Sequence, residues 1–172
     1  IDELSLSYNI VFVISAGNIT LSNLNFFGYP NSYPEYFFNN TKEIKIIDPA
    51  TSVYALTVGS ICQEYGPRNI NQNDIFHSPA LTEYPSPFTR VGLGFNDMIK
   101  PEMVETGGNI IISSDNNIQN QDVGGKIIVF NSNWIKDAKL FSVDYGTSIS
   151  TPKVAHQIAK LFNLYPNFSA NL

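Results

Sequence analysis

A serine at position 148 stands where the sequence predicts the start of a helix. Residues 146–156 read Gly-Thr-Ser-Ile-Ser-Thr-Pro-Lys-Val-Ala-His. Apolar residues then recur at helical spacing, at Val154, Ile158, Leu161 and Phe162. The first N–H groups of a helix lack partners within it, and the helix dipole makes that end positive. An alkoxide or oxyanion would be stabilised there, which makes Ser148 a candidate nucleophile.

Asn18 is the second candidate for chemistry. It closes an apolar run over residues 11–16, which is typical of a buried strand of a parallel sheet. A side-chain amide is a neutral donor, so it can stabilise charge on a developing oxyanion without a proton transfer. Taken alone, each candidate has an ordinary explanation, since Gly-Thr-Ser and Gly-Asn are common turn sequences.

The stretch around Ser148 resembles the nucleophile motif of the subtilisin-like serine proteases (subtilases), usually Gly-Thr-Ser-Met-Ala-x-Pro-x-Val-Ala-Gly. The matching positions are Gly146, Thr147, Ser148, Pro152, Val154 and Ala155. Ile149, Ser150 and His156 stand where the family usually has Met, Ala and Gly. The run that ends in Ala-Gly-Asn at residues 16–18 resembles the subtilase strand whose terminal asparagine donates to the oxyanion.

Three further segments support the resemblance, which runs from about residue 8 to residue 163. They are residues 52–60, 86–92 and 100–107. The last resembles Lys-Pro-Asp-Val-Val-Ala-Pro-Gly, from which Glu105 and Thr106 depart. The resemblance implies a serine endopeptidase that acts by acyl transfer on a peptide or protein substrate. In it, Ser148 attacks the scissile carbonyl, and Asn18 with the backbone N–H of Ser148 stabilises the oxyanion. Serine is a weak nucleophile and needs a base beside it.

The histidine that would act as the base is missing from the part of the sequence where the resemblance places it. Subtilases carry their triad in the order Asp, His, Ser, and no histidine precedes Asn18. His156 follows Ser148 by eight residues, which is a rise of about 12 Å along a helix. His77 lies in a Pro-rich stretch that follows Asn18. We therefore expect residues 1–172 to be the C-terminal portion of a subtilase catalytic domain, inactive alone, whose N-terminal half with Asp and His is a partner.

Two other functions stay open. One is a catalytically inactive subtilase-like domain used for protein interaction, which the departures from the family pattern would fit, at Ile149, Ser150, His156, Glu105 and Thr106. An Asp-x-Gly segment and a His-Gly segment upstream in the full reading frame would favour the active form. The other is an unrelated α/β binding module, which requires Ser148 and Asn18 to lie far apart.

Composition bounds the class of protein. The chain has 172 residues, 43% of them hydrophobic, enough for one domain with its own core. Its net charge of −5 argues against nucleic acid, which needs a basic face. No apolar run approaches the roughly 18 residues of a membrane span. The lone Cys62 is expected to be a buried small side chain. The compartment is not assigned: the family resemblance favours a secreted or cell-envelope protein, and an intracellular one stays open.

The expected fold is α/β, with the three-layer architecture of the subtilases. We expect part of a parallel sheet of three strands, a central helix over 148–163 that carries the serine, and a small β-hairpin. Strands are predicted at residues 10–16, 53–62 and 110–112, and the hairpin at 126–130 with 140–143. Residues 19–50 and 63–85 are predicted as loops, the first as an elaborated surface loop. Spacing alone would start the helix at Pro152 with Thr151 as N-cap, whereas the resemblance places the start near Ser148.

No cofactor is expected to take part in the chemistry, and no residue is assigned to a metal. Asp115 and Asp122 fall in an Asn-rich stretch whose spacing matches no EF-hand loop. Because subtilases often carry calcium, a structural calcium ion stays open. Lys139 and Lys153 are expected to be solvated. The apolar strand at 11–16 is expected to leave an unpaired edge, so we predict that the chain self-associates or is stable only with its N-terminal half supplied in trans.

Overall fold

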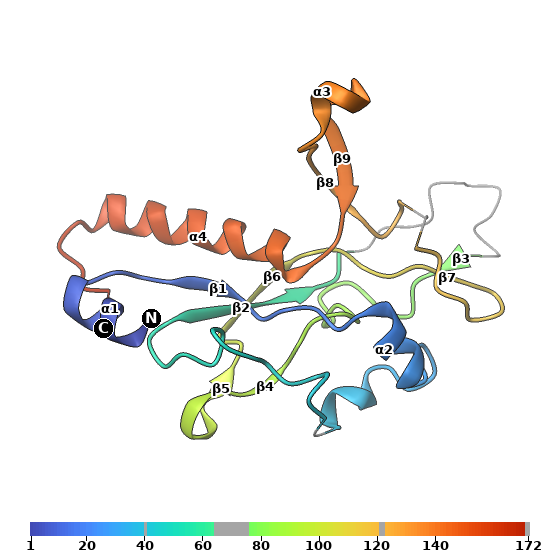
Figure 1. The fold of residues 1–172 in the computed structure, drawn as a ribbon, viewed down its shortest axis with the longest axis horizontal. Helices are drawn as coiled ribbons and strands as arrows, with labels where there is room; N and C mark the ends of the chain where they lie inside the picture. The colour runs from blue at the N-terminus through green and yellow to red at the C-terminus, as the bar shows by residue number, and fades with distance from the viewer. Residues whose placement is uncertain (40, 64–75, 121–122, 171–172) are drawn as a thin grey trace.

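A three-stranded parallel sheet lies at the centre of the computed structural model, which describes residues 1–39, 41–63, 76–120 and 123–170 (Figure 1). Its strands are β1 (Val13–Ser15), β2 (Leu56–Ile61) and β6 (Met103–Thr106), in the order β1-β2-β6. The helix α4 (Thr147–Leu164) contacts all three strands. This arrangement confirms the predicted α/β fold with a central helix.

The sheet register brings the ends of the strands together. Val13 pairs with Leu56 in the β1–β2 ladder, and Val58 pairs with Met103 in the β2–β6 ladder, both parallel. The arrows of β1 and β2 point toward the end of the molecule where α4 begins (Figure 1). Segments that follow the carboxyl ends of these strands therefore meet the first turn of α4.

The prediction of a strand at 110–112 as part of the central sheet is wrong. The third parallel strand is β6, because the extended chain at 103–106 pairs with β2. Residue 112 instead begins β7 (Ile112–Ser113), which pairs antiparallel with β3 (Phe76–His77). The strands predicted at 10–16 and 53–62 exist but are shorter, since only Val13–Ser15 and Leu56–Ile61 form strands in the sheet.

Residues 19–50 form part of the core, which corrects the prediction of a surface loop. They hold the helix α2 (Leu21–Phe26) and the short 3-10 helix η1 (Glu35–Phe38). The buried members of this core cluster are Ile19, Leu24, Tyr29, Tyr36, Ile44, Phe88, Ile110 and Ile112. Two tyrosines of this region place their hydroxyls on backbone carbonyls: Tyr33 donates to Pro85 O at 2.6 Å and Tyr36 donates to Pro87 O. Of the loop predicted at 63–85, residues 64–75 lie outside the described part of the chain.

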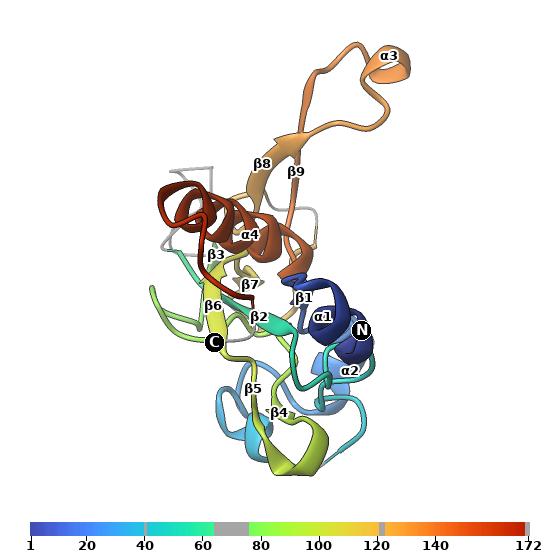
Figure 2. The ribbon, with the colours of Figure 1, turned by 90° about the vertical axis from the view of Figure 1, so that its left-hand side faces the viewer.

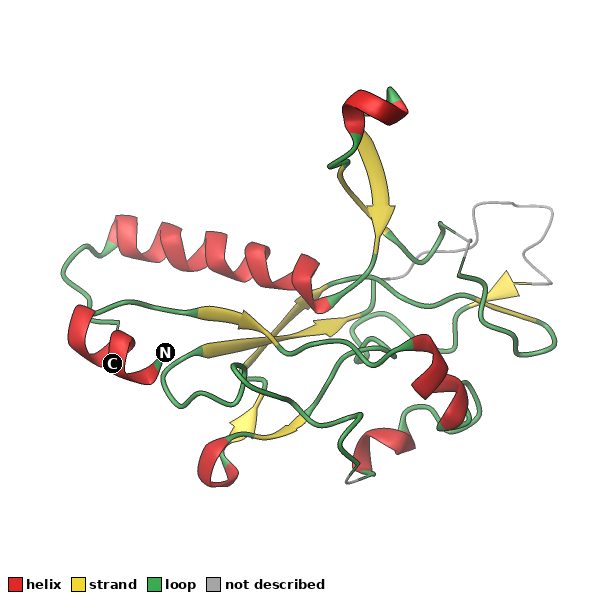
Figure 3. Ribbon diagram, in the orientation of Figure 1, coloured by secondary structure: helices red, strands yellow, loops and turns green. Residues whose placement is uncertain are grey.

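A β-hairpin projects from the body and leads into α4 (Figures 1 and 2). It consists of β8 (Ile127–Phe130) and β9 (Phe141–Asp144), paired antiparallel with Phe130 opposite Phe141. The short helix α3 (Trp134–Asp137) lies at its tip. The hairpin was predicted from sequence and is confirmed. The remaining elements are α1 (Asp2–Tyr8), β4 (Gly92–Leu93), η3 (Phe95–Asp97) and β5 (Ile99–Lys100) (Figure 3).

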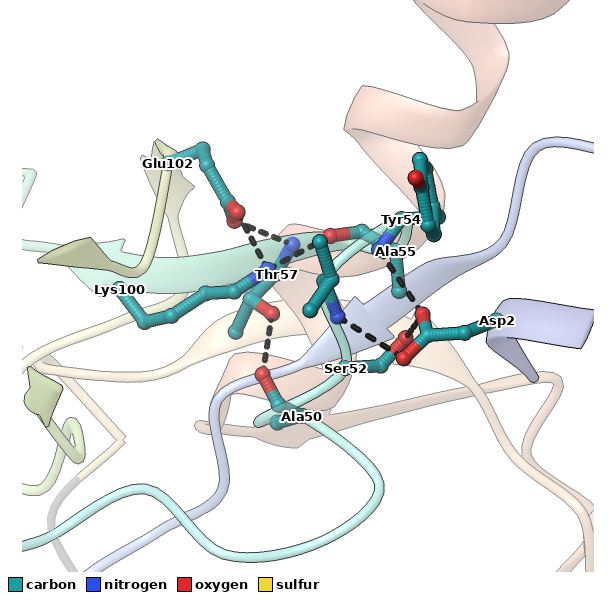
Figure 4. Close-up of polar contacts among 9 residues, drawn as sticks. Asp2, Ala50, Ser52, Tyr54, Ala55, Thr57, Lys100 and Glu102 are labelled. Carbon is teal, nitrogen blue, oxygen red and sulfur yellow. Dashed lines mark hydrogen bonds and ion pairs between the residues drawn. The ribbon is translucent and has the colours of Figure 1, made fainter. Parts of the chain in front are cut away.

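Polar contacts fix the start of β2 (Figure 4). The Asp2 carboxylate accepts hydrogen bonds from the backbone N–H groups of Val53 at 3.2 Å and Tyr54 at 2.9 Å. Lys100 donates to Ala55 O at 2.8 Å and pairs with Glu102, although its side chain is wholly buried. Glu102 in turn accepts the Thr57 N–H at 2.8 Å. A buried ammonium must be paired with acceptors, as that of Lys100 is here. These contacts hold β2 in place at its amino-terminal end.

No helix among the described residues is long and apolar enough to span a membrane.

Candidate active site

The helix α4 begins at Thr147, as the family resemblance predicted. Gly146 occupies the N-cap position with φ 154° and ψ 160°. The alternative start at Pro152 is wrong, because Thr151 already lies within the helix and its hydroxyl donates to Thr147 O at 2.7 Å. Pro152 has no N–H to give to the carbonyl four residues earlier, that of Ser148, and the helix tolerates this loss in its second turn.

Thr147 joins the helix start to the end of β1. Its N–H and its hydroxyl both donate to the Oδ1 atom of Asn18, each at 3.0 Å. The same hydroxyl oxygen accepts the N–H of Gly17 at 3.2 Å. Thr147 is almost wholly buried, whereas Asn18 is exposed, so these bonds lie at the border between the interior and the surface. Two motifs that lie about 130 residues apart in sequence therefore meet through direct contacts.

Asn18 Nδ2 and Ser148 Oγ border the same small space above Gly146. A Cβ atom placed on Gly146 would lie 2.9 Å from Asn18 Nδ2 and 3.2 Å from Ser148 Oγ. Both residues are exposed, so a substrate can reach them. Neither Nδ2 nor Oγ hydrogen-bonds to another residue within the described ranges. This proximity removes the alternative of an unrelated module, which required Ser148 and Asn18 to lie far apart.

The backbone around Asn18 is fixed as well. Ile19 N–H donates to Phe88 O at 2.6 Å, and Arg90 N–H donates to Gly17 O at 3.1 Å. The Arg90 guanidinium also donates through Nε to Asn18 O at 3.3 Å. The Asn18 side chain therefore extends from a braced segment.

Small hydroxyl side chains lie behind the site. Ser60 and Ser86 share a hydrogen bond of 2.7 Å, and Ser86 donates to Gly108 O at 2.7 Å. Cys62 is fully buried beside Ser86, and burial raises the pKa of its thiol to about 12. The thiol is therefore protonated at neutral pH and is no nucleophile. The prediction of a buried, unreactive Cys62 is confirmed.

The two histidines of the chain lie elsewhere. His156 is exposed on α4, eight residues beyond Ser148. His77 is exposed on β3, which Figure 1 shows well away from the start of α4. Neither is placed to take a proton from Ser148 Oγ.

The described residues hold no group of three or more metal-ligating side chains. Asp115 accepts hydrogen bonds from the Ser113 hydroxyl and, at 2.6 Å, from the Asn117 amide. The Ser113 hydrogen bond, with that of Asn117, holds the pKa of the Asp115 carboxyl below its usual range. Asp122 lies outside the described residues, so a structural calcium ion stays open.

Sequence reasoning missed what Thr147 and Lys153 do. Lys139 is exposed, as expected. Lys153 is only partly solvated: its side chain is 38% exposed, and its ammonium donates to Thr106 O at 2.8 Å. The departure of Glu105 and Thr106 from the family pattern was visible in the sequence. Their contact with α4 was not, because more than 40 residues separate the partners.

Comparisons with known proteins agree with this geometry. A family model described as "Subtilase family" matches residues 2–171. The chain is 30% identical over 180 residues to "Uncharacterized protein y4bN" of Sinorhizobium fredii (strain NBRC 101917 / NGR234). That match covers the whole of this chain and 40% of the relative, so the chain spans less than half of the relative's length. No solved structure matches the chain.

Proposed function

Since the chain belongs to the subtilase family, we propose that it supplies the nucleophile and the oxyanion hole of a subtilisin-type serine endopeptidase. Family membership supports a protease-type function. The residue roles are our proposal: Ser148 Oγ attacks the scissile carbonyl, while Asn18 Nδ2 and the backbone N–H of Ser148 stabilise the oxyanion. The N–H of Ser148 lies in the first turn of α4, where it has no partner four residues earlier within the helix.

The orientation of the Asn18 amide carries the proposal. Its Oδ1 accepts two hydrogen bonds from Thr147, each of 3.0 Å. The reversed amide would point NH₂ at the donor N–H of Thr147 and lose an acceptor there. The contacts therefore leave Nδ2 as the free donor, on the side where Gly146 and Ser148 lie. A fixed, uncharged donor beside an exposed serine is the arrangement that stabilises a tetrahedral intermediate.

A histidine base and an aspartate that orients it must come from another segment of the protein or from a separate chain. Ser148 is exposed, so such a segment has access to Oγ. No cofactor is needed, because acyl transfer proceeds by proton transfer and charge stabilisation alone. The 172-residue chain alone is then inactive, and the complete protein cleaves peptide bonds.

Labelling of the full-length protein with a fluorophosphonate probe tests this function. We expect covalent labelling at Ser148, identified by mass spectrometry, and its loss in Ser148→Ala. Ser142→Ala is the matched control, because Ser142 is exposed on the neighbouring β9 and makes no predicted contribution. The isolated chain should not label at a comparable rate. Failure of the intact protein to label would contradict the proposal and favour an inactive subtilase-like domain used for protein interaction.

A further inference from the structure

Three consecutive carbonyl groups at the end of β6 each accept a hydrogen bond from the start of α4. Gly107 O accepts the N–H of Gly146 at 2.8 Å. Glu105 O accepts the Ser150 hydroxyl at 2.8 Å, and Thr106 O accepts the Lys153 ammonium at 2.8 Å. Ser150 and Lys153 are three residues apart, so they lie on one face of α4, and Gly146 is the N-cap of the same helix. This face of α4 therefore rests on residues 105–107.

Two charged side chains, Lys153 and Glu105, strengthen the contact between α4 and residues 105–107. The Lys153 ammonium lies 2.5 Å from Thr106 Oγ1, and that hydroxyl donates to Glu105 Oε1 at 2.8 Å. Glu105 Oε1 also accepts the N–H of Thr106 at 2.7 Å and lies 4.0 Å from the Lys153 ammonium. One hydroxyl thus connects a cation to an anion, and charge-assisted bonds of this kind are the stronger ones. We call Glu105, Thr106, Ser150 and Lys153 the polar clamp.

The backbone at Gly107 lies too close to the helix start to leave room for a side chain. A Cβ atom on Gly107 would meet Ser60 Oγ, and it would lie 2.5 Å from Ser150 Oγ and 2.7 Å from Gly146 O. Gly107 therefore brings the end of β6 directly against the helix start. Ser148 lies midway between Gly146 and Ser150, both of which are bonded to residues 105–107.

We propose that the polar clamp positions Ser148, so that Ser150 and Lys153 are positioning residues for the nucleophile. The inference rests on the proposed function of Ser148. Glu105, Thr106 and Ser150 all depart from the residues usual in the family pattern, and the structure places these departures in contact. The clamp side chains do not hydrogen-bond to Ser148 or Asn18, so they act on the reaction through the turn alone.

The rate of fluorophosphonate labelling of the full-length protein is the first test. Lys153→Met and Ser150→Ala should each lower the second-order labelling rate by roughly 10- to 100-fold, since small misplacements of a reacting group cost this much. Lys153→Arg keeps a charged donor and should restore most of the rate. For a short peptide substrate, kcat should fall while KM changes little. Lys160→Met is the matched control, because Lys160 is exposed further along the same helix.

Amide hydrogen exchange of the peptide that contains residues 146–148 is the second readout, and it does not need an active enzyme. Exchange there should quicken in Lys153→Met and Ser150→Ala and stay unchanged in Lys160→Met. Unaltered exchange at 146–148 in both variants would overturn the clamp, as would a labelling rate that falls only in proportion to the unfolded fraction. If the wild-type protein does not label at all, the proposed function fails, and the exchange experiment alone decides whether the clamp orders the turn.

Discussion

The Oδ1 atom of Asn18 accepts two hydrogen bonds from one residue, Thr147, each of 3.0 Å. One donor is the backbone N–H at the start of α4, and the other is the Thr147 hydroxyl. Because both donors approach the same oxygen, the amide plane is set from the helix itself. The nitrogen of Asn18 is thereby directed to the side where Gly146 and Ser148 lie, so the position of the Asn18 amide relative to Ser148 depends on Thr147.

Asn18→Ala should lower kcat of the full-length protein by about 10²–10³ with little effect on KM, because the lost donor acts mainly in the transition state. Steady-state turnover of a peptide substrate measures both constants. Asn25→Ala is a suitable control, since Asn25 is exposed on α2. A rise in KM with unchanged kcat would show that Asn18 binds substrate rather than stabilising the oxyanion.

Thr147→Val should reduce kcat by a smaller factor than Asn18→Ala, because the Thr147 N–H still holds Oδ1 when the hydroxyl is lost. The substitution also leaves the Gly17 N–H without the oxygen that it bonds at 3.2 Å, at a cost of about 1–3 kcal/mol in stability. Thr147→Ser keeps the hydroxyl and should retain most of the activity. Turnover and urea unfolding, measured on the same samples, separate the two effects. A loss of activity in the Ser variant that the Val variant does not share would show that the methyl group, not the hydroxyl, matters.

Gly146→Ala should abolish labelling of Ser148. The added Cβ would stand 2.9 Å from Asn18 Nδ2 and 3.2 Å from Ser148 Oγ, in the space that a substrate carbonyl must enter. The φ of 154° also disfavours alanine. Gly28→Ala separates the two causes, because Gly28 has φ of 83° but the nearest atom to its Cβ is 3.7 Å away, at Ser32. This control should lose thermal stability and keep its labelling rate. Normal labelling of Gly146→Ala would mean that the oxyanion lies elsewhere.

Local sequence patterns predicted the parts of the fold that local forces determine. The helical spacing after Ser148 predicted α4, and the run at 126–130 that Gly124-Gly125 opens, followed by a second run at 140–143, predicted the β8–β9 hairpin. The site motifs predicted that Asn18 and the start of α4 meet, and the structure brings them together. Their catalytic roles stay predictions.

Contacts between distant segments explain what could not be predicted. Residues 19–50 look like a loop because prolines interrupt their periodicity, yet Tyr33 bonds the carbonyl of Pro85, 52 residues away. In the same way, the residues around Lys153 do not indicate that its ammonium bonds the carbonyl of Thr106, 47 residues earlier. Burial and pairing of this kind depend on which strands come together, and β6 was not among the strands predicted.

Stability should fall in acid partly through Glu105. The Thr106 N–H bond, with the Thr106 hydroxyl and Lys153, holds the pKa of the Glu105 carboxyl below its usual value, although burial opposes this. A carboxyl whose folded pKa is lowered stabilises the fold above its unfolded pKa and loses this contribution as the pH falls through the folded value. The melting temperature of wild type should therefore exceed that of Glu105→Gln at pH 7, and the gap should close below about pH 4. Glu3→Gln, on the exposed face of α1, is the control. A gap that does not depend on pH would exclude a role for the charge.

The isolated chain should self-associate, because both outer strands of its sheet carry apolar side chains. The order β1-β2-β6 makes β1 and β6 the edges of this three-stranded sheet. Met103 and Val104 on β6 are 40% and 50% exposed, and apolar edges of this kind recruit other chains. Sedimentation at tens of micromolar should show oligomers.

A charged substitution on β6 tests whether this edge strand is the surface through which the chains associate. Val104→Lys should shift the sedimentation profile toward monomer, since a lysine on an edge strand opposes pairing with a second strand. Leu81→Lys is the matched control, because Leu81 is 63% exposed in a loop away from the sheet edge. The same shift in both variants would assign the association to general hydrophobicity. A wild-type chain that sediments as a monomer and unfolds cooperatively would contradict the prediction, and it would show that these edges are stable in water without a covering partner.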